Sequence, residues 1–567
     1  MVVLHKGDRL QFIPRHVGPN VLPQFLLFER MVRWAALQPH LIAVKDLTFG
    51  HTASYAQLLT DILAMKNALR SKLSPDLIKK LDNDEEVFIN LLATPGYEFT
   101  VGFLGIVALG AAVSPLSPEW PAKEAATLVN RASASALLST HNCLPKAKEV
   151  AQMVSSTTNP SYYCVEVKPY IMNPPLPTDQ IHISSGLSLD LDGSGLIIFT
   201  SGTTGPPKGA VRRRSFFIDH CMHVADTFGL TTGETVLHQL PVHHITGVGF
   251  TLCPFLLSGG CIEFKTGGFD TVFTWERISK GGLTYFSGVP TIYMRLMQYY
   301  EQNLATLPPE KLKPYLDGIS GFKHLMCGTS ALPRPLQEKW TKLRGGRRIM
   351  TRYGGTEFGS GFVVPPGADD CPPTSVGIVT PGVDLKLSEG DEGEILMRSP
   401  TMFARYVNDP AATAAAHTPD GYYKTGDIGR REGKYYYILG RASVDIMKSG
   451  GYKISALDVE REILGLPYIS EVMVCGVEDE EFGERVAAAI VLKGREDLPI
   501  DDLRKDLRSS LPGYQMPTLL RIVKDIPKNA TGKVMKKQLR PQVFPPGGHP
   551  DIQRWVRPAK RAPESRI

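Results

Sequence analysis

The sequence lacks an apolar run long enough to cross a membrane. Its most hydrophobic segment, residues 101–113, has 13 residues with three glycines. A spanning helix needs about 20 residues, so we expect this segment to form a helix of the protein core. Residues 1–16 lack an extended apolar stretch, so a secretory signal is not expected either.

Cysteine spacing and net charge argue against two further classes of protein. The eight cysteines are scattered without a Cys-x-x-Cys pair, which disfavours a zinc site or a disulfide framework and favours a reducing compartment. A formal charge of +6 is small for 567 residues, so no nucleic-acid partner is expected. We find no internal repeat and no heptad pattern.

What is present is an alternation of two patterns. From about residue 28 to residue 492, short β-branched runs alternate with helical periodicity. This alternation predicts an α/β fold with parallel sheets. The clearest predicted strands are residues 86–92, 195–200, 284–287 and 324–326.

The pattern of predicted secondary structure changes near Gly440. The pattern after it predicts a compact α+β unit of ordinary domain size. Its expected elements are strands at 471–477, 486–492 and 519–523 and a helix at 501–511. Residues beyond Phe544 combine prolines with dispersed basic residues, which predicts a tail.

The most informative segment follows the predicted strand that ends at Phe199. It contains three glycines, several hydroxyl side chains and Lys208 near its end. Glycines let a backbone approach a ligand closely, and clustered N–H and hydroxyl groups surround anionic oxygens. The order differs from the Walker A pattern. We interpret the segment as a phosphate-binding loop; a flexible Ser/Gly linker is the alternative.

Two later constellations carry groups suited to a nucleotide. In residues 353–357, an aromatic residue and two glycines precede a Thr-Glu pair, and a carboxylate there has the oxygen ligands that Mg²⁺ prefers. In residues 423–427, Asp427 closes a short turn-like segment and its carboxylate suits a ribose diol. Taken singly, each is equally consistent with a solvated turn residue.

Residues 440–453 and 527–533 complete the pattern, each with basic residues beside glycines. Together and in this order, the five segments resemble the adenylate-forming superfamily. That superfamily contains acyl-CoA synthetases, adenylation domains of peptide synthetases, and beetle luciferases. The resemblance covers roughly residues 25–540.

The resemblance implies a large N-terminal domain with stacked, mostly parallel sheets and a small mobile α+β domain joined by a hinge. We place the adenylation domain at 1–442, the mobile domain at 443–544 and the basic, Pro-rich tail at 545–567. The implied substrates and cofactors are a small carboxylic acid, ATP, Mg²⁺ and coenzyme A.

The resemblance also implies roles for single residues in nucleotide binding. The implied ATP and AMP contacts are Thr200, Ser201, Gly202, Thr203, Thr204, Gly205, Lys208, Gly328, Thr329, Ser330, Tyr353, Gly354, Thr356, Asp427 and Arg441. Within this set the loop from Thr200 to Lys208 holds the β- and γ-phosphates, and Asp427 and Arg441 hold the ribose. Glu357 and Thr204 are the implied metal ligands. Lys533 enters the site during adenylation.

A hinge and a coenzyme A channel follow from the same likeness. The segment after Arg441 is one residue longer than in many family members, so two candidates for the pivot remain, Ser443 and Asp445. Gly450, Gly451 and Tyr452 face the pantetheine channel in the second conformation. The implied catalytic residues are Lys533, Thr356, Glu357 and His244.

Two parts of the resemblance concern the identity of the carboxylic acid substrate. Residues 241–247 resemble the family segment whose histidine lies at the carboxylate end of the acyl pocket; His244 matches it, and Gly247 follows. Residues 289–297, 330–340 and 440–460 resemble malonyl-CoA synthetases, in which a basic residue matching Arg295 pairs with the distal carboxylate. Physically, a dianion needs a cation at the pocket floor, and arginine offers a bidentate fork. The alternative is that Arg295 faces solvent from its helix.

Other substrates and the cellular location stay open. Gly355 replaces a methionine frequent in the family, and residues 358–361 border the pocket; both enlarge it. A medium-chain, branched or aromatic acid of fatty-acid or secondary metabolism is therefore one alternative, and a stand-alone peptide-synthetase or luciferase activity is another. The last three residues, Ser565-Arg566-Ile567, resemble a peroxisomal import signal. We expect a peroxisomal or cytoplasmic enzyme rather than a mitochondrial one.

Overall fold

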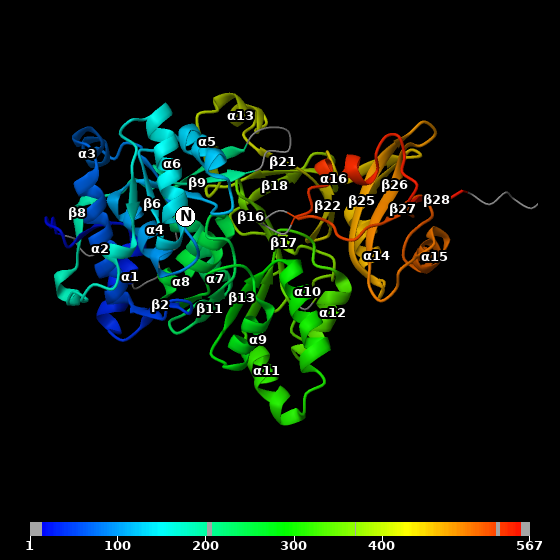
Figure 1. Ribbon diagram of the computed structural model, residues 1–567, viewed down its shortest axis with the longest axis horizontal. Coiled ribbons are helices and arrows are strands. Elements are labelled where there is room, and N and C mark those ends of the chain that lie inside the picture. Colours follow the sequence, from blue (N-terminus) through cyan, green and yellow to red (C-terminus); the bar gives the residue numbers. More distant parts are fainter. Residues whose placement is uncertain (1–13, 201–206, 369, 529–532, 557–567) are drawn as a thin grey trace, which may run out of the picture.

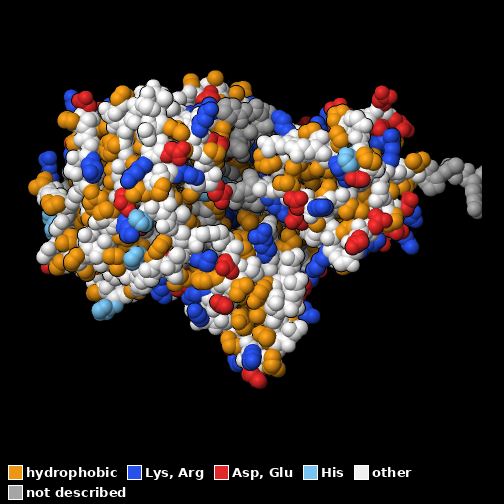
Figure 2. Space-filling view, in the orientation of Figure 1, with side chains coloured by type: hydrophobic (Ala, Val, Ile, Leu, Met, Phe, Trp, Pro, Cys, Tyr) orange, Lys and Arg blue, Asp and Glu red, His pale blue; other side chains and the backbone are white. Residues whose placement is uncertain are grey.

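The computed structural model describes residues 14–200, 207–368, 370–528 and 533–556. The chain forms a large N-terminal part and a small C-terminal part that lies beside one end of it (Figure 1). In the space-filling view a notch separates the two parts, and acidic and basic side chains are interspersed over this face (Figure 2). Within the described residues, no helix has the length and apolar character that crossing a bilayer requires.

The first sheet of the large part has seven strands in the order β20-β10-β9-β5-β4-β6-β7. The run from β9 to β7 is parallel, whereas β10 and β20 are antiparallel additions at one edge. The strands are β4 (Phe88–Leu92), β5 (Ala112–Leu116), β6 (Ala136–Ser139), β7 (Cys164–Glu166), β9 (Ser194–Thr200), β10 (Lys208–Arg213) and β20 (Phe403–Tyr406).

The second sheet has nine strands in the order β17-β16-β15-β14-β13-β11-β12-β2-β3. Its six central strands, from β15 to β2, are parallel. The strands are β2 (Ile42–Asp46), β3 (His51–Ser54), β11 (Thr235–His238), β12 (Cys261–Phe264), β13 (Tyr285–Gly288), β14 (His324–Cys327), β15 (Met350–Gly355), β16 (Gly359–Val363) and β17 (Ile378–Val379).

Helices cover both faces of both sheets, because alternate strand residues are apolar on both sides. In β4, Ile89 and Leu91 face the core between the two sheets, whereas Phe88 and Leu92 face the outer helices. The inner helices are α1 (Leu26–Leu37), α2 (Tyr55–Lys72), α4 (Tyr97–Leu109), α7 (Asp219–Thr227) and α8 (Cys253–Ser258). The outer ones are α5 (Ala122–Ala132) and α6 (Leu144–Thr157) on the first sheet, and α9 (Thr271–Ser279), α10 (Pro290–Tyr299), α11 (Pro309–Gly321) and α12 (Arg334–Leu343) on the second.

A third, four-stranded antiparallel sheet leads toward the small part. It consists of β18 (Asp384–Leu387), β19 (Glu392–Arg398), β21 (Tyr423–Glu432) and β22 (Tyr435–Arg441). Near the N-terminus, β1 (Val21–Gln24) pairs in parallel with β8 (His182–Ser188). Two further helices are α3 (Pro75–Asp82) and α13 (Pro410–Ala415).

The small part is a six-stranded sheet with helices on both faces. Val472 and Val474 of the central ribbon pack in the same cluster as α14 and α15, while Met473 and Cys475 pack with α16. The elements are β23 (Ile446–Ser449), β24 (Tyr452–Ser455), α14 (Ala456–Leu464), β25 (Ile469–Asp479), β26 (Gly483–Leu492), α15 (Ile500–Asp506), β27 (Leu519–Ile522), α16 (Lys536–Val543) and β28 (Ile552–Arg554).

The predicted fold class is confirmed: a large α/β part with mostly parallel stacked sheets precedes a small α+β part. Two local expectations need correction. The apolar run 101–113 is not one helix, because α4 ends at Leu109, Gly110 adopts a left-handed conformation (φ 88°), and β5 begins at Ala112. The predicted tail also starts too early, because residues 552–554 form β28 on the edge of the small sheet.

Candidate active site

The two ends of the predicted phosphate loop meet the Thr-Glu segment. Thr200 ends β9 and lies opposite Lys208, which begins β10. The Thr200 hydroxyl donates to Oε1 of Glu357 (3.3 Å), and the Tyr406 hydroxyl donates to the same oxygen (3.0 Å). Lys208 Nζ lies over the Tyr406 ring, 5.1 Å from its centroid. The predicted contacts from Ser201 to Gly205 lie outside the described residues.

A buried arginine that sequence reasoning missed fixes this segment. Arg212 is fully buried on β10. Its guanidinium donates to the backbone carbonyls of Thr356 (2.9 Å) and Glu357 (3.2 Å), and also to that of Thr401. Burial lowers its pKa to about 9, against an opposing attraction by Glu357. The strand that leaves the phosphate loop therefore holds the backbone of the predicted metal ligand.

The predicted ribose pair is formed between two neighbouring strands. Asp427 on β21 lies opposite Arg441 on β22, and Arg441 Nε lies 2.9 Å from Asp427 Oδ1. The second carboxylate oxygen accepts the Tyr353 hydroxyl at 2.6 Å. Burial, followed by the nearby Asp427 charge, raises the pKa of Tyr353 far above its usual value. A hydrogen bond thus joins Tyr353, predicted to contact the adenine, directly to Asp427, predicted to hold the ribose.

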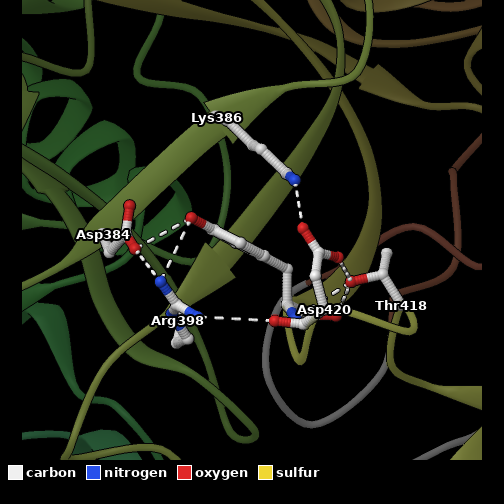
Figure 3. A network of polar contacts seen from close by, with 6 residues as sticks. Asp384, Lys386, Arg398, Thr418 and Asp420 are labelled. Atoms are coloured by element: carbon white, nitrogen blue, oxygen red, sulfur yellow. Dashed lines mark hydrogen bonds and ion pairs between the residues drawn. The ribbon is translucent and has the colours of Figure 1, made fainter.

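A surface network holds the turn that leads into β21 (Figure 3). Asp384 on β18 accepts from Arg398 on β19 (2.6 Å) and from the Tyr422 hydroxyl (2.8 Å). Asp420 accepts from Lys386 (2.6 Å), whose Nζ lies over the Tyr422 ring, 4.2 Å from its centroid. The hydrogen bond from Lys386 is the main reason why the pKa of Asp420 is lowered to about 2. Two strands thus fix the approach to Asp427.

Lys533 lies at the junction of the two parts of the chain. Although this side chain reaches solvent, partial burial and then repulsion by Arg441 lower its pKa, while Asp427 and Asp445 act in the opposite direction. The charges of Arg441 and Asp427 therefore act on the Lys533 ammonium group. In this structure the residue from the small part lies within electrostatic range of the predicted ribose pair of the large part.

The remaining adenine candidates follow β14, the neighbour of β15 in the second sheet. Gly328 is buried against the side chain of Arg352. Thr329 has a left-handed backbone (φ 76°) that few residues other than glycine adopt, and Thr329 and Ser330 are exposed. Gly354 stands next to Tyr353 on β15, where a Cβ would lie 2.2 Å from the carbonyl oxygen of Gly359.

The predicted acyl-pocket segment is compact. His244 Nδ1 lies 2.9 Å from the Thr246 hydroxyl. A Cβ at Gly247 would lie 2.4 Å from the carbonyl oxygen of Pro241, so glycine is required there. Burial lowers the pKa of His244 to about 4, with further repulsion from His243 and Arg352. His244 is therefore a neutral imidazole near neutral pH.

The cation beside His244 is Arg352, which sequence reasoning did not single out. Its guanidinium lies over the Phe250 ring, 3.3 Å from the centroid, and Nε is buried without a hydrogen-bond partner. Among the described residues it forms no ion pair with a carboxylate. Burial lowers its pKa to about 10. The available signal was its position, directly before Tyr353 on β15.

Arg295 lies elsewhere. It occupies the exposed side of α10, whose buried side carries Ile292, Tyr293 and Leu296. In the part of the chain that the structure describes, no hydrogen bond or ion pair joins it to His244 or Arg352. The structure thus shows Arg295 exposed on its helix, and its pairing with a distal carboxylate stays a prediction.

The predicted coenzyme A and hinge residues lie in the small part and at its entry. Gly450 and Gly451 have positive φ angles (55° and 83°) in the turn between β23 and β24. Tyr452 is 52% exposed and its ring stacks on that of Tyr514 with a centroid distance of 4.2 Å. Of the two hinge candidates, Ser443 is exposed, whereas Asp445 is buried.

Comparison with known proteins places these features in a family. The AMP-binding enzyme family model matches residues 31–407, and the model of the AMP-binding enzyme C-terminal domain matches residues 458–533. A CoA ligase of Gibberella moniliformis is 30% identical, covering 96% of this chain and 96% of its own. A malonate–CoA ligase of Arabidopsis thaliana is 34% identical, covering 80% of this chain and 77% of its own.

The fold comparison agrees. ATP-bound MatB from Rhodopseudomonas palustris matches with a TM-score of 0.74 at 24% identity, over 91% of this chain and 99% of its own. The likeness covers the large and the small part together. With two family models matched in the expected order, the chain belongs to the AMP-binding enzyme family and, within it, to the AMP-forming acid–CoA ligases.

Proposed function

We propose that this enzyme joins malonate, or a closely related small dicarboxylic acid, to coenzyme A at the expense of ATP. In the first step a carboxylate oxygen of the acid attacks the α-phosphorus of ATP, and pyrophosphate leaves with the electrons of the broken P–O bond. In the second step the sulfur of coenzyme A attacks the acyl carbon, AMP leaves, and the thiol proton is released.

The residues near Glu357 and Asp427 would carry the first step. Thr200, Lys208 and the loop between them would hold the β- and γ-phosphates, and Thr356 the α-phosphate. Asp427 and Arg441 would hold the ribose. Lys533 would oppose the negative charge that develops at the α-phosphorus, and the action of the Arg441 and Asp427 charges on its ammonium group supports this role.

The oxygen chemistry around Glu357 fits Mg²⁺. Both hydrogen bonds to its carboxylate end on Oε1. Within the described residues no group of three or more His, Cys, Asp or Glu side chains could hold a metal ion. Glu357 would therefore hold Mg²⁺ together with phosphate oxygens and water, as is usual for this ion. When bound, the ion supplies positive charge that offsets the repulsion between carboxylate and triphosphate.

The acid is inferred from one observation: Arg352 is partly buried, its charge acts on His244, and it has no acidic partner among the described residues. A guanidinium whose Nε is buried without a partner is costly to leave without an anion, and the distal carboxylate of a dicarboxylic acid would supply that anion in a bidentate geometry. An apolar acid would leave the charge unpaired. The Arabidopsis relative, named a malonate–CoA ligase, supports the same substrate class.

The two-conformation cycle is part of this proposal. We assign residues 1–442 to adenylation and 443–544 to the mobile domain, with the sheet strand β28 added to the latter. Ser443 is the better pivot, because the Asp445 side chain pairs with Lys536 and its carbonyl accepts from Ala456 N. The Gly450–Tyr452 turn would approach the pantetheine arm after rotation.

Release of AMP with coenzyme A and a panel of acids tests the substrate. The panel is malonate, methylmalonate, acetate, hexanoate and benzoate. We expect malonate or methylmalonate to give the highest kcat/KM. A preference for hexanoate or benzoate would establish the alternative, a ligase for medium-chain or aromatic acids. Gly355 does not by itself provide the room for such an acid, because the Phe358 ring lies 2.5 Å from the position of a Cβ there. Oxygen uptake during turnover would instead indicate a luciferase-like reaction.

The half-reactions test the assignment of the lysine and the glycine turn. Lys533→Ala should reduce acid-dependent ATP–pyrophosphate exchange to a small residual rate but retain thioester formation from a supplied acyl-adenylate. Gly451→Trp should do the reverse, because its Cβ position is open in this conformation while the pantetheine arm would need that space. Equal losses in both half-reactions would contradict the two-conformation cycle.

The location of the enzyme in the cell is a separate proposal. Ser565, Arg566 and Ile567 lie outside the described residues, so the import signal rests on their sequence alone. Fluorescent fusions with and without these residues distinguish peroxisomal, cytoplasmic and mitochondrial locations.

A further inference from the structure

A buried ionic triad lies directly behind Lys533. Lys536, the first residue of α16, places Nζ 2.6 Å from Asp445 Oδ1 and 2.7 Å from Glu460 Oε1. The three side chains are only 11%, 11% and 14% exposed. Although burial acts to lower it, attraction by Glu460 and Asp445 raises the pKa of Lys536 above its usual value. Lys536 is therefore charged in this site.

The triad connects the core of the small part to the hinge and to the ribose site. Glu460 Oε1 also accepts the backbone N–H of Val474, on the central strand β25, at 2.7 Å. On the other side, Asp445 Oδ2 accepts the backbone N–H of Arg441 at 3.0 Å. Arg441 is the residue whose side chain binds Asp427. One carboxylate thus links Lys536 to the backbone of a ribose residue.

The chain between Lys533 and Lys536 is short and is held at both ends. Val534 forms a β-bridge with Lys528 on the other side of the loop, and the Lys528 side chain pairs with Glu471 on β25 at 2.9 Å. Two residues, Val534 and Met535, separate Lys533 from Lys536. The direction in which the Lys533 side chain leaves the small part is therefore set by how α16 begins.

We propose that Lys536 is a positioning residue for the adenylation half-reaction: by binding Asp445 and Glu460 it fixes the start of α16, so that Lys533 is directed at the Asp427–Arg441 pair. The proposal rests on the role of Lys533 proposed above. A buried ion pair is a poor device for stability alone, since apolar residues of similar volume often serve as well. In this protein the ion pairs would instead fix one orientation of the start of α16, and with it the direction of the Lys533 side chain.

The test compares Lys536→Met and Lys536→Arg with Lys505→Met, a matched control on the exposed side of α15. The acid is the one of the panel that gives the fastest AMP release. We expect Lys536→Met to slow ATP–pyrophosphate exchange at least tenfold and to change thioester formation from the supplied acyl-adenylate less than twofold. Lys536→Arg should recover part of the exchange rate, and Lys505→Met should resemble the parent enzyme.

The double variant Lys533→Ala/Lys536→Met separates the possible outcomes. If Lys536 acts through Lys533, the double variant should lose no more exchange activity than Lys533→Ala alone. Additive losses, or an equal loss in both half-reactions with a lower unfolding midpoint, would show a merely structural role and overturn the inference. If Lys533→Ala itself keeps its exchange activity, the proposed role of Lys533 fails instead, and the inference that rests on it falls with it.

Discussion

The two halves of the candidate site differ in how their charges are balanced. On the nucleotide side, the Asp427 carboxylate is bound by Tyr353 and Arg441, and that of Glu357 by hydroxyl groups. On the predicted acyl side, Arg352 is partly buried, its charge acts on His244, and it has no carboxylate partner among the described residues. The carboxylates of the predicted nucleotide side thus already have partners in this structure, whereas the proposed acyl pocket would receive its anion from the substrate.

The largest expected effect tests the acyl side. Arg352→Met should lower kcat/KM for malonate about 100-fold, since a charge-assisted bidentate contact is worth roughly 3 kcal/mol. Acetate, which has no second carboxylate, should lose much less. The free energy of unfolding should change little, because the charge that is removed is only partly buried and has no acidic partner among the described residues. Equal losses for malonate and acetate would contradict the proposed pairing.

His244 should also contribute to the pH dependence of stability, together with other histidines whose pKa burial lowers, among them His220, His238, His243 and His324. His244 has a folded-state pKa of about 4 against about 6.5 in an unfolded chain. The unfolded chain therefore binds a proton between these values that the folded chain does not, and stability falls as the pH is lowered from about 6.5 to about 4. His244→Asn should lose about 2 kcal/mol less over this range. Chemical denaturation at pH 7.5, 6 and 5 measures this difference; identical slopes would contradict it.

On the nucleotide side, we expect removal of a charge to lower the free energy of unfolding. Asp427→Asn keeps the shape of the side chain but removes the charge that Arg441 and Tyr353 face. Because Arg441 is partly exposed, we expect a loss of about 1 kcal/mol in the free energy of unfolding and a roughly tenfold higher KM for ATP. Calorimetry and ATP titration measure both. A gain in stability would mean that this half is not balanced as described.

The smallest effect is expected at Arg295. Its exposed position on α10 means that solvent screens its charge, so Arg295→Ala should lower kcat/KM for malonate about threefold or less. Measured beside Arg352→Met, this variant decides which arginine meets the distal carboxylate. A loss for Arg295→Ala larger than that for Arg352→Met would restore Arg295 to that role.

Motif order and the resemblance it carries were enough to predict the layered α/β architecture, and the structure brings the motif residues Thr200 and Glu357, and Asp427 and Arg441, into contact. Asp427 and Arg441 lie on strands joined by a short turn, so their pairing follows from local register. Arg352 was missed because a strand pattern does not tell which buried polar residue has a partner. Lys536 was missed for a related reason: its partners Asp445 and Glu460 lie 91 and 76 residues earlier in the chain, and only tertiary packing brings them together.

The last described strand has a practical consequence for recombinant work. β28 covers the outer edge of β27, and Trp555, just after it, lies under the guanidinium of Arg504, which is 3.8 Å from the ring centroid. A truncated protein that stops at Phe544, where the recognisable motifs have ended, would leave β27 as an open edge strand. Open edges recruit strands from other molecules. Such a truncation would form aggregates at concentrations where the full chain stays monodisperse, even though every residue proposed for catalysis is present.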